Sequence, residues 1–164
     1  MLAYIKAKII PIQDIHRRAA QWRFLSQRIV FTNGCFDILH YGHIHYLAEA
    51  KALGDILIVG LNSAASIKRL KGEHRPIQDD LTRQYQLAAM VAVDAVVEFD
   101  DDTPLELIKI IQPDVLVKGG DWQPEQIVGS DVVLARRGIV KSLPYVENYS
   151  TTNIEQHILR QHQK

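Results

Sequence analysis

Five short apolar runs punctuate the sequence, at residues 29–31, 56–59, 95–97, 115–117 and 139–140. They are rich in β-branched side chains, which is typical of strands that are covered on both faces, as in a parallel sheet. Segments with apolar residues at helical spacing lie between the runs, at 44–51, 81–92 and 104–111. This alternation predicts βαβ units in an α/β fold, a Rossmann-like doubly wound parallel sheet with helices on both faces.

Two further helices are indicated at the ends of the chain. Ser150 to Asn153 provide capping residues before a terminal helix. Residues 12–25 place apolar side chains at helical spacing, with basic residues elsewhere, and predict a helix on the domain edge. A partner-binding helix is the alternative. We therefore expect residues 1–27 to form an N-terminal extension with a helix and residues 28–164 to form the main domain.

Composition excludes several classes of protein. Of the 164 residues, 47% are hydrophobic, which is enough for one sizeable core. The 19 basic and 19 acidic residues balance, so the one-signed field expected of a nucleic-acid or anionic-membrane binder is missing. Cys35 is the only cysteine, which fits a reducing compartment, and no apolar run is long enough for a membrane span. These features predict a cytoplasmic protein with no membrane or nucleic-acid partner.

Polar and glycine-rich clusters follow three of the predicted strands, at residues 32–43, 62–63 and 118–121. Ligands of open α/β sheets bind beyond the carboxyl ends of the strands, near the point where strand order reverses. We therefore expect the three clusters to converge on one site.

The first cluster has the composition of a phosphate site. Gly34 and Gly42 let the backbone approach a ligand closely, and the amides of the helix that follows favour a bound phosphate. His40 and His43 flank Gly42, and either an imidazolium or a neutral imidazole can donate to the charge that builds during phosphoryl-type transfer. A zinc site that also uses Cys35 and His45 is a weaker alternative, because the spacing matches no common structural zinc pattern. We expect no protein-bound metal.

Residues 33–43 resemble the signature Gly-x-Phe-Asp-x-x-His-x-Gly-His of the cytidylyltransferase-like superfamily, and residues 150–152 resemble its late Ser-Thr-Thr element. Within the superfamily the sequence is most similar to the D-glycero-β-D-manno-heptose 1-phosphate adenylyltransferases, over residues 31–37, 61–63, 69–72, 75–76 and 117–121. The resemblance runs in order from about residue 29 to residue 158 and implies an α/β/α nucleotidyltransferase fold. A sugar kinase domain precedes this module in bifunctional members, and the present chain resembles the stand-alone form.

The resemblance implies roles for individual residues. His40, His43 and Lys71 would be catalytic, although Lys71 could be an ordinary solvated loop lysine. The nucleotide would be bound by Thr32, Asn33, Gly34, Phe36, Gly42, Lys118, Gly119, Gly120, Asp121, Ser150, Thr151 and Thr152. The substrate phosphates would be bound by Asn62, Arg75 and Arg83. Simple helix capping is the alternative for the two threonines, and an ordinary turn is the alternative for residues 118–121.

Two positions depart from the family pattern. Ala64 stands where many relatives have aspartate in an Asn-Ser-Asp element, which puts an acidic contact there in doubt. The late element also lacks the arginine found in some relatives, so Lys71, Arg75 and Arg83 are expected to carry the positive charge.

The activity implied by the resemblance is transfer of AMP from ATP, with Mg²⁺ bound to the triphosphate, onto the heptose 1-phosphate. The products would be pyrophosphate and an ADP-heptose for lipopolysaccharide core synthesis, and a homodimer or higher homo-oligomer is implied. The nearest alternative is a cytidylyltransferase acting on glycerol 3-phosphate. A catalytically inactive nucleotide-binding regulator is a second alternative, which the presence of both His40 and His43 disfavours. A nucleic-acid-binding module fits the neutral charge poorly.

Overall fold

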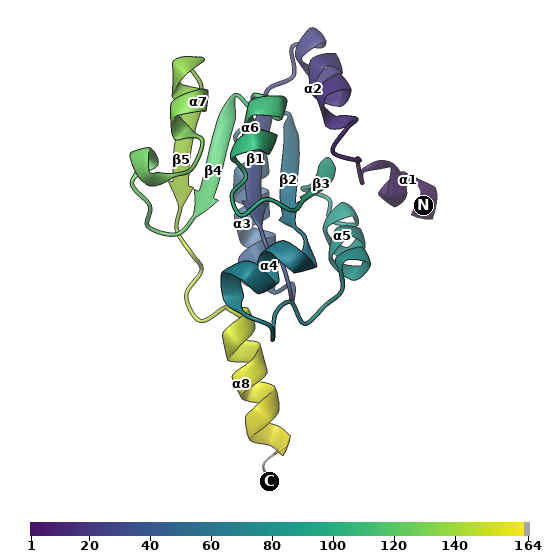
Figure 1. The fold of residues 1–164 in the computed structure, drawn as a ribbon, viewed down its shortest axis with the longest axis vertical. Helices are drawn as coiled ribbons and strands as arrows, with labels where there is room; N and C mark the ends of the chain where they lie inside the picture. Colours follow the sequence, from purple (N-terminus) through teal and green to yellow (C-terminus); the bar gives the residue numbers. More distant parts are fainter. Residues whose placement is uncertain (163–164) are drawn as a thin grey trace.

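A five-stranded, all-parallel sheet runs through the computed structural model, which describes residues 1–162 (Figure 1). Its strands are β1 (Ile29–Gly34), β2 (Ile56–Asn62), β3 (Ala95–Phe99), β4 (Val115–Gly119) and β5 (Ile139–Leu143). Their spatial order is β3-β2-β1-β4-β5, so the chain builds outward from β1 and then returns to place β4 on its other side. All five predicted strands and the doubly wound order are confirmed. The order reverses between β1 and β4, where such sheets bind ligands.

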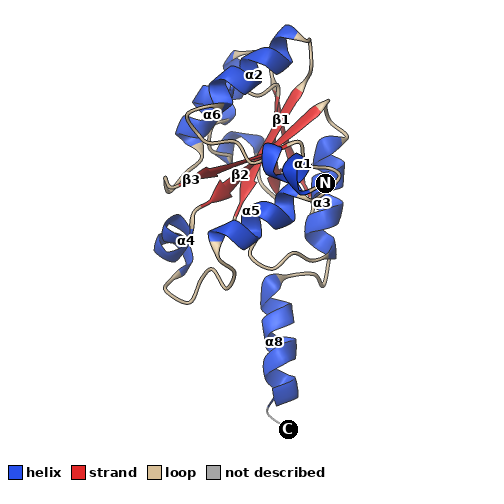
Figure 2. Ribbon diagram, turned by 90° about the vertical axis from the view of Figure 1, so that its right-hand side faces the viewer, coloured by secondary structure: helices blue, strands red, loops and turns tan. Residues whose placement is uncertain are grey.

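Helices cover both faces of the sheet (Figure 2). One apolar cluster joins the sheet to α2 (Ile15–Phe24), α6 (Leu105–Ile111) and α7 (Ser130–Ala135). The other joins it to α3 (Tyr41–Lys51) and α5 (Asp80–Ala88). Neighbouring strand residues go to opposite clusters, as with Val30 and Phe31, which are both fully buried. This two-sided burial explains why the strands are continuous apolar runs rather than alternating ones.

The N-terminal segment packs onto the same sheet. After α1 (Leu2–Ala7), the backbone pairs with β3: Ile10 N donates to Val96 O at 2.9 Å, and Val96 N donates to Lys8 O at 2.8 Å. The helix expected within residues 12–25 is α2, and its Ile15 and Ala19 are fully buried in the core. The N-terminal extension therefore shares the core of the main domain.

The remaining elements lie near the ends of the strands. They are α4 (Ala64–Lys71), the 3₁₀ turn η1 (Pro124–Gln126) and α8 (Thr151–His162). Helix α8 extends away from the body at the carboxyl end of the strands (Figures 1 and 2). The helix expected over 81–92 ends at Ala88, because the chain must turn into β3 and buries Val93 on the way. Among the described residues, no helix is both long and apolar enough to cross a membrane.

Candidate active site

The two histidines of the first cluster meet at the start of α3. His40 is the N-cap residue, with extended backbone (φ −140°, ψ 172°), and His43 lies in the first turn. Their rings stack with centroids 3.9 Å apart and an interplanar angle of 24°. A Cβ at Gly42 would lie 3.1 Å from the His40 ring and 3.2 Å from Cβ of Tyr149. Glycine at position 42 therefore lets the His40 ring lie against the helix start.

A buried aromatic side chain supports the pair from behind. Phe36 adopts a left-handed backbone (φ 43°), is 5% exposed, and its ring centroid lies 5.2 Å from that of His43. A Cβ at Gly34 would approach the Phe36 ring to 3.0 Å, so this position also requires a very small residue. The Phe36 side chain was expected to contact the nucleotide. In the structure it is buried and packs against the His43 ring, which it helps to position.

Burial keeps both histidines neutral at physiological pH. Burial, with smaller contributions from His40 and from the charge of Lys71, lowers the pKa of His43 to about 4. Burial also lowers the pKa of His40. The Nδ1 atoms of both rings are buried and have no hydrogen-bond partner among the residues that the structure describes. Of the two protonation states that the sequence allowed, the structure favours a neutral imidazole, which can still donate one N–H to a phosphate.

The lowered pKa of His43 makes the stability of the fold depend on pH. The unfolded chain binds a proton at His43 near pH 6.5, whereas the folded protein binds it only near pH 4. The stabilisation is therefore complete above pH 6.5 and is lost as the pH falls towards 4. We expect a loss of up to about 3 kcal/mol in the free energy of unfolding.

Urea unfolding of the wild type and of His43→Asn at pH 7.5, 6.5, 5.5 and 4.5 measures this loss. Because carboxylates also titrate in this range, the informative quantity is the difference between the two proteins. Exposed His16 on α2 offers a matched control, His16→Asn, which should follow the wild type. Parallel pH curves for the wild type and His43→Asn would contradict the expectation.

Two lysines bring positive charge to the same place. Lys71 lies close enough for its charge to lower the pKa of both His43 and Lys118, although burial is the larger cause in each case. Lys118 on β4 donates from Nζ to Oδ1 of Asn33 at 3.3 Å, which links the ends of β4 and β1. The sequence had placed Lys71 in a loop; it is instead the last residue of α4, followed by Gly72 at φ 95°. The structure thus brings the clusters at 32–43 and 118–121 together with the end of α4, and the cluster at 62–63 adjoins the first because β2 pairs with β1.

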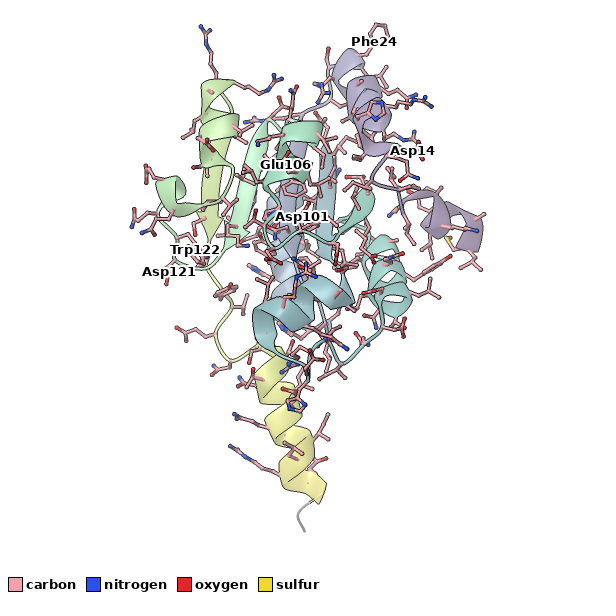
Figure 3. The ribbon with its side chains drawn as sticks, viewed as in Figure 1. Asp14, Phe24, Asp101, Glu106, Asp121 and Trp122 are labelled. Atoms are coloured by element: carbon pink, nitrogen blue, oxygen red, sulfur yellow. The ribbon has the colours of Figure 1, made fainter. Side chains whose placement is uncertain are left out.

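Aromatic side chains surround the glycine pair that follows β4. A Cβ at Gly119 or at Gly120 would come within 3.0 Å of the Tyr145 ring, and Gly120 has a left-handed φ of 110°. Trp122 donates from Nε1 to Gly119 O at 3.0 Å, and Asp121 lies beside it, exposed, in the loop after β4 (Figure 3). The sequence reasoning missed Tyr145 and Trp122. Trp122 is signalled only by following the glycine pair closely in the sequence, and no glycine near Tyr145 in the sequence marks that residue.

The expected ligand contact of the Thr32 side chain is not available in this structure. Thr32 is fully buried, and its hydroxyl shares a 2.5 Å hydrogen bond with the hydroxyl of Tyr46. Burial raises the pKa of Tyr46, so its phenol stays protonated. The pair ties β1 to α3 and so holds the strand end beneath the histidines.

Arg83 and Asn62 do not present the phosphate-binding groups that the sequence led us to expect. Arg83 is 0% exposed, and its Nη1 donates to Cys35 O at 2.8 Å and to Asn62 O at 2.9 Å, while Nη2 is paired with Asp80. Asn62 is 4% exposed and donates from Nδ2 to Oγ of Ser66. A buried guanidinium needs such acceptors. Arg83 therefore holds together the chain segments that follow β1 and β2 through buried hydrogen bonds.

Arg75 stays at the edge of the site. It is bound to Asp37 Oδ2 at 3.3 Å and to Glu155 of α8. Asp37 is 6% exposed and also accepts from the backbone N–H groups of residues 77 and 78 at 2.8–2.9 Å. The buried carboxylate thus orders the 75–78 loop, and Arg75 connects that loop to α8.

The start of α8 completes the site. Ser150 caps the helix, because its Oγ accepts from Asn153 N at 3.1 Å, as the capping pattern predicted. A cavity of about 290 Å³ lies between His40 and this end of α8. Thr151 is half-buried and Thr152 exposed, as the first residues of the helix. The sequence reasoning gave no site role to the six other residues that line the cavity: Asn148, Tyr149, Asn153, Ile154, His157 and Ile158. The spacing of Ile154, His157 and Ile158 places them on one face of α8, but nothing local in the sequence turns that face towards His40.

Two histidines, two lysines and a glycine-containing helix start thus lie together at the carboxyl ends of the strands of a doubly wound parallel sheet. Comparison with known proteins identifies the family. The family model described as cytidylyltransferase-like matches residues 31–157. The chain belongs to the cytidylyltransferase-like family, a family of nucleotidyltransferases, and its fold agrees with that assignment.

Curated relatives are similar over most of this chain. The protein named "Bifunctional protein HldE" from Nitratiruptor sp. is 55% identical over 142 residues, 87% of this chain and 28% of that protein. The protein of the same name from Marinomonas sp. is 59% identical over 146 residues, 89% of this chain and 31% of that protein. The chain therefore spans less than a third of the length of these relatives.

Solved structures share the fold. A lipopolysaccharide core biosynthesis protein from Thermoplasma volcanium is 28% identical, with a TM-score of 0.59, and the match covers 76% of this chain and 99% of that one. A pantoate-beta-alanine ligase from Francisella tularensis is 18% identical, with a TM-score of 0.59, over 93% of this chain and 78% of that one. At this lower identity the likeness concerns the fold alone.

Proposed function

We propose that the chain transfers AMP from ATP to D-glycero-β-D-manno-heptose 1-phosphate, giving ADP-heptose and pyrophosphate for lipopolysaccharide core synthesis in the cytoplasm. The observation that carries the proposal is the stacked, neutral pair His40 and His43 at a glycine-containing helix start, with Lys71 and Lys118 close by. The relatives named HldE and the structural neighbour described as a lipopolysaccharide core biosynthesis protein support the choice of substrate.

The arrangement suits a direct displacement. A phosphate oxygen of the sugar 1-phosphate attacks the α-phosphorus of ATP, and the bond from that phosphorus to the pyrophosphate oxygen breaks. Negative charge builds on the oxygens of the transferred group and of the leaving pyrophosphate. In the proposal, His40 and His43 donate hydrogen bonds to these oxygens and Lys71 supplies positive charge. Positioning and charge stabilisation carry the catalysis, and no covalent enzyme intermediate is needed.

The donor set fits a magnesium ion carried by the nucleotide rather than by the protein. No group of three or more His, Cys, Asp or Glu side chains in residues 1–162 could hold a metal. The nearby carboxylate of Asp37 is buried and already accepts bonds from the 75–78 loop. Mg²⁺ is commonly bound mainly by substrate phosphates and water. When bound there, it would neutralise triphosphate charge.

The residues around the glycine pair are proposed to hold the nucleoside. Gly119 and Gly120 allow close approach to the backbone, and Tyr145 and Trp122 offer exposed aromatic faces, at 73% and 45% exposure, on which a base can stack. The amides and hydroxyls at the start of α8 are proposed to contact the phosphates.

Substrate choice can be tested by measuring pyrophosphate release. We expect turnover with ATP and the heptose 1-phosphate to exceed turnover with CTP and glycerol 3-phosphate by at least about tenfold, because a mismatched pocket costs about 1.4 kcal/mol or more. The assay uses all four nucleoside triphosphates against a panel of sugar and alcohol phosphates.

Each outcome of this assay separates two readings. A preference for CTP would overturn the substrate assignment and leave the reaction class standing. No turnover with any pair, in protein that still binds ATP, would favour the inactive nucleotide-binding regulator.

We also propose that the chain forms a homodimer or higher homo-oligomer.

A further inference from the structure

A second concave site lies at the amino ends of the strands, whereas His40 lies at their carboxyl ends. It is a cavity of about 520 Å³ among the start of β1, the start of β5 and the ends of α2 and α7. Phe24, the last residue of α2, marks this end of the molecule (Figure 3). The volume lies within the usual range of small-molecule sites. Nothing in the proposed transfer reaction uses this cavity.

Positive charge is concentrated in this cavity. Four of the ten arginines line it, Arg23, Arg28, Arg136 and Arg137, although the whole chain has a formal net charge of zero. The one acidic residue in the lining, Asp114, accepts from Ile29 N at 2.7 Å through Oδ2. Four guanidinium groups and one carboxylate leave a formal charge of +3 around the cavity.

Most of this charge has no partner in the protein. Arg23 donates from Nη1 to Ile111 O at 2.7 Å. Its guanidinium therefore caps the carboxyl end of α6, which accounts for one of the four charges. Within residues 1–162, the guanidinium groups of Arg28, Arg136 and Arg137 have no carboxylate within 4 Å and make no hydrogen bond. By contrast, Arg69, Arg75 and Arg83 are all paired with acids.

Arg137 stands where glycine would be favoured. It follows the C-cap of α7 in the left-handed region (φ 61°), and its N–H donates to Leu134 O at 2.9 Å, while Gly138 N donates to Val133 O at 2.9 Å. Helices that end in this way most often use glycine at the left-handed position, because a side chain there is strained. The helix end therefore does not require an arginine at position 137.

We propose that this cavity binds a small molecule that carries a diphosphate or triphosphate group. Guanidinium groups bind phosphate oxygens in a forked, two-bond geometry, and several of them around one hollow match a ligand of three or four negative charges. Pro113 and Ile139, which is 49% exposed, supply an apolar wall for the rest of the ligand. The cavity is separate from the candidate active site because it lies at the amino ends of the strands and the histidines lie at the carboxyl ends.

Residue-resolved binding tests the proposal on the full chain. Amide NMR shifts are followed while inorganic pyrophosphate or ATP is added without magnesium at about 0.15 M salt, where weak surface attraction is screened. We expect saturable shifts at Arg28 and at residues 136–139, in addition to any at the active site. Saturation by pyrophosphate alone would assign the recognition to the phosphates, and saturation by ATP alone would assign it to the whole nucleotide; either supports the proposal.

Arg137→Gly isolates the guanidinium from the fold. It removes one charge and relieves the left-handed strain, so the melting temperature should hold or rise while affinity at this cavity falls at least about tenfold. The matched control is Arg17→Ala, an exposed arginine of α2 outside the cavity, which should change affinity less than about twofold. The proposal is wrong if residues 136–139 show no saturable shift, if Arg137→Gly binds as the wild type does, or if only an acidic peptide produces the shifts.

Discussion

Replacing His43 by alanine should lower turnover by a factor of about 10² or more, and replacing His40 by alanine should have a similar effect. The stacked rings form one donor pair at the helix start, and removing one preorganised donor to a transition-state oxyanion typically costs this much. The buried Nδ1 atoms lack partners among the described residues, so the pair is not required by the hydrogen bonding of the fold. Steady-state pyrophosphate release with both substrates varied measures the loss.

His45 offers a matched control two residues along the same helix. Its ring is 40% exposed and lies 3.8 Å from Glu49, so His45→Ala should change turnover less than about threefold. Thermal melts of all three variants exclude misfolding. His43→Asn, which keeps a polar group nearer in size, separates lost chemistry from the effect of a cavity between position 43 and Phe36. Near-normal turnover in well-folded His40→Ala and His43→Ala proteins would remove the histidines from the proposed phosphate contacts.

The sequence was most informative where a residue's neighbours along the chain determine its environment. The apolar runs predict the strands because both faces of a parallel sheet are buried, and Ser150 predicts the start of α8 because capping is a contact across three residues. The convergence of 32–43 with 118–121 follows from strand order. Local pattern and topology therefore account for the frame of the site.

The sequence failed where long-range packing decides which atoms a side chain meets. Nothing around Arg83 in the sequence shows that the carbonyls of Cys35 and Asn62 accept hydrogen bonds from its guanidinium, because those residues lie at the ends of other strands. The exposed aromatic Tyr145 stands beside the glycine pair only because β5 runs alongside β4. The neutral state of His43 likewise depends on burial and on Lys71, a charge brought from α4.

Lys71→Met should lower kcat/KM by roughly 10² or more, which corresponds to about 2.7 kcal/mol of lost transition-state stabilisation. An ammonium at the exposed end of α4 can follow the negative charge as it shifts from substrate to transition state. Because Lys71 is exposed, the melting temperature of the free protein should change little. Lys71→Arg should recover part of the activity, since it keeps the charge with a different shape.

Lys68→Met is the matched control, because Lys68 lies on the same helix, is 49% exposed, and pairs with Glu73 at 3.6 Å rather than pointing its charge at the histidines. A second readout does not depend on turnover. The charge of Lys71 depresses the pKa of His43, so an NMR titration should find that pKa raised above about 4 in Lys71→Met and unmoved in Lys68→Met. A kinetic change below threefold with a raised His43 pKa would keep Lys71 beside the site but transfer the catalytic charge to Arg75, whose guanidinium would then have to leave Glu155 when substrate binds.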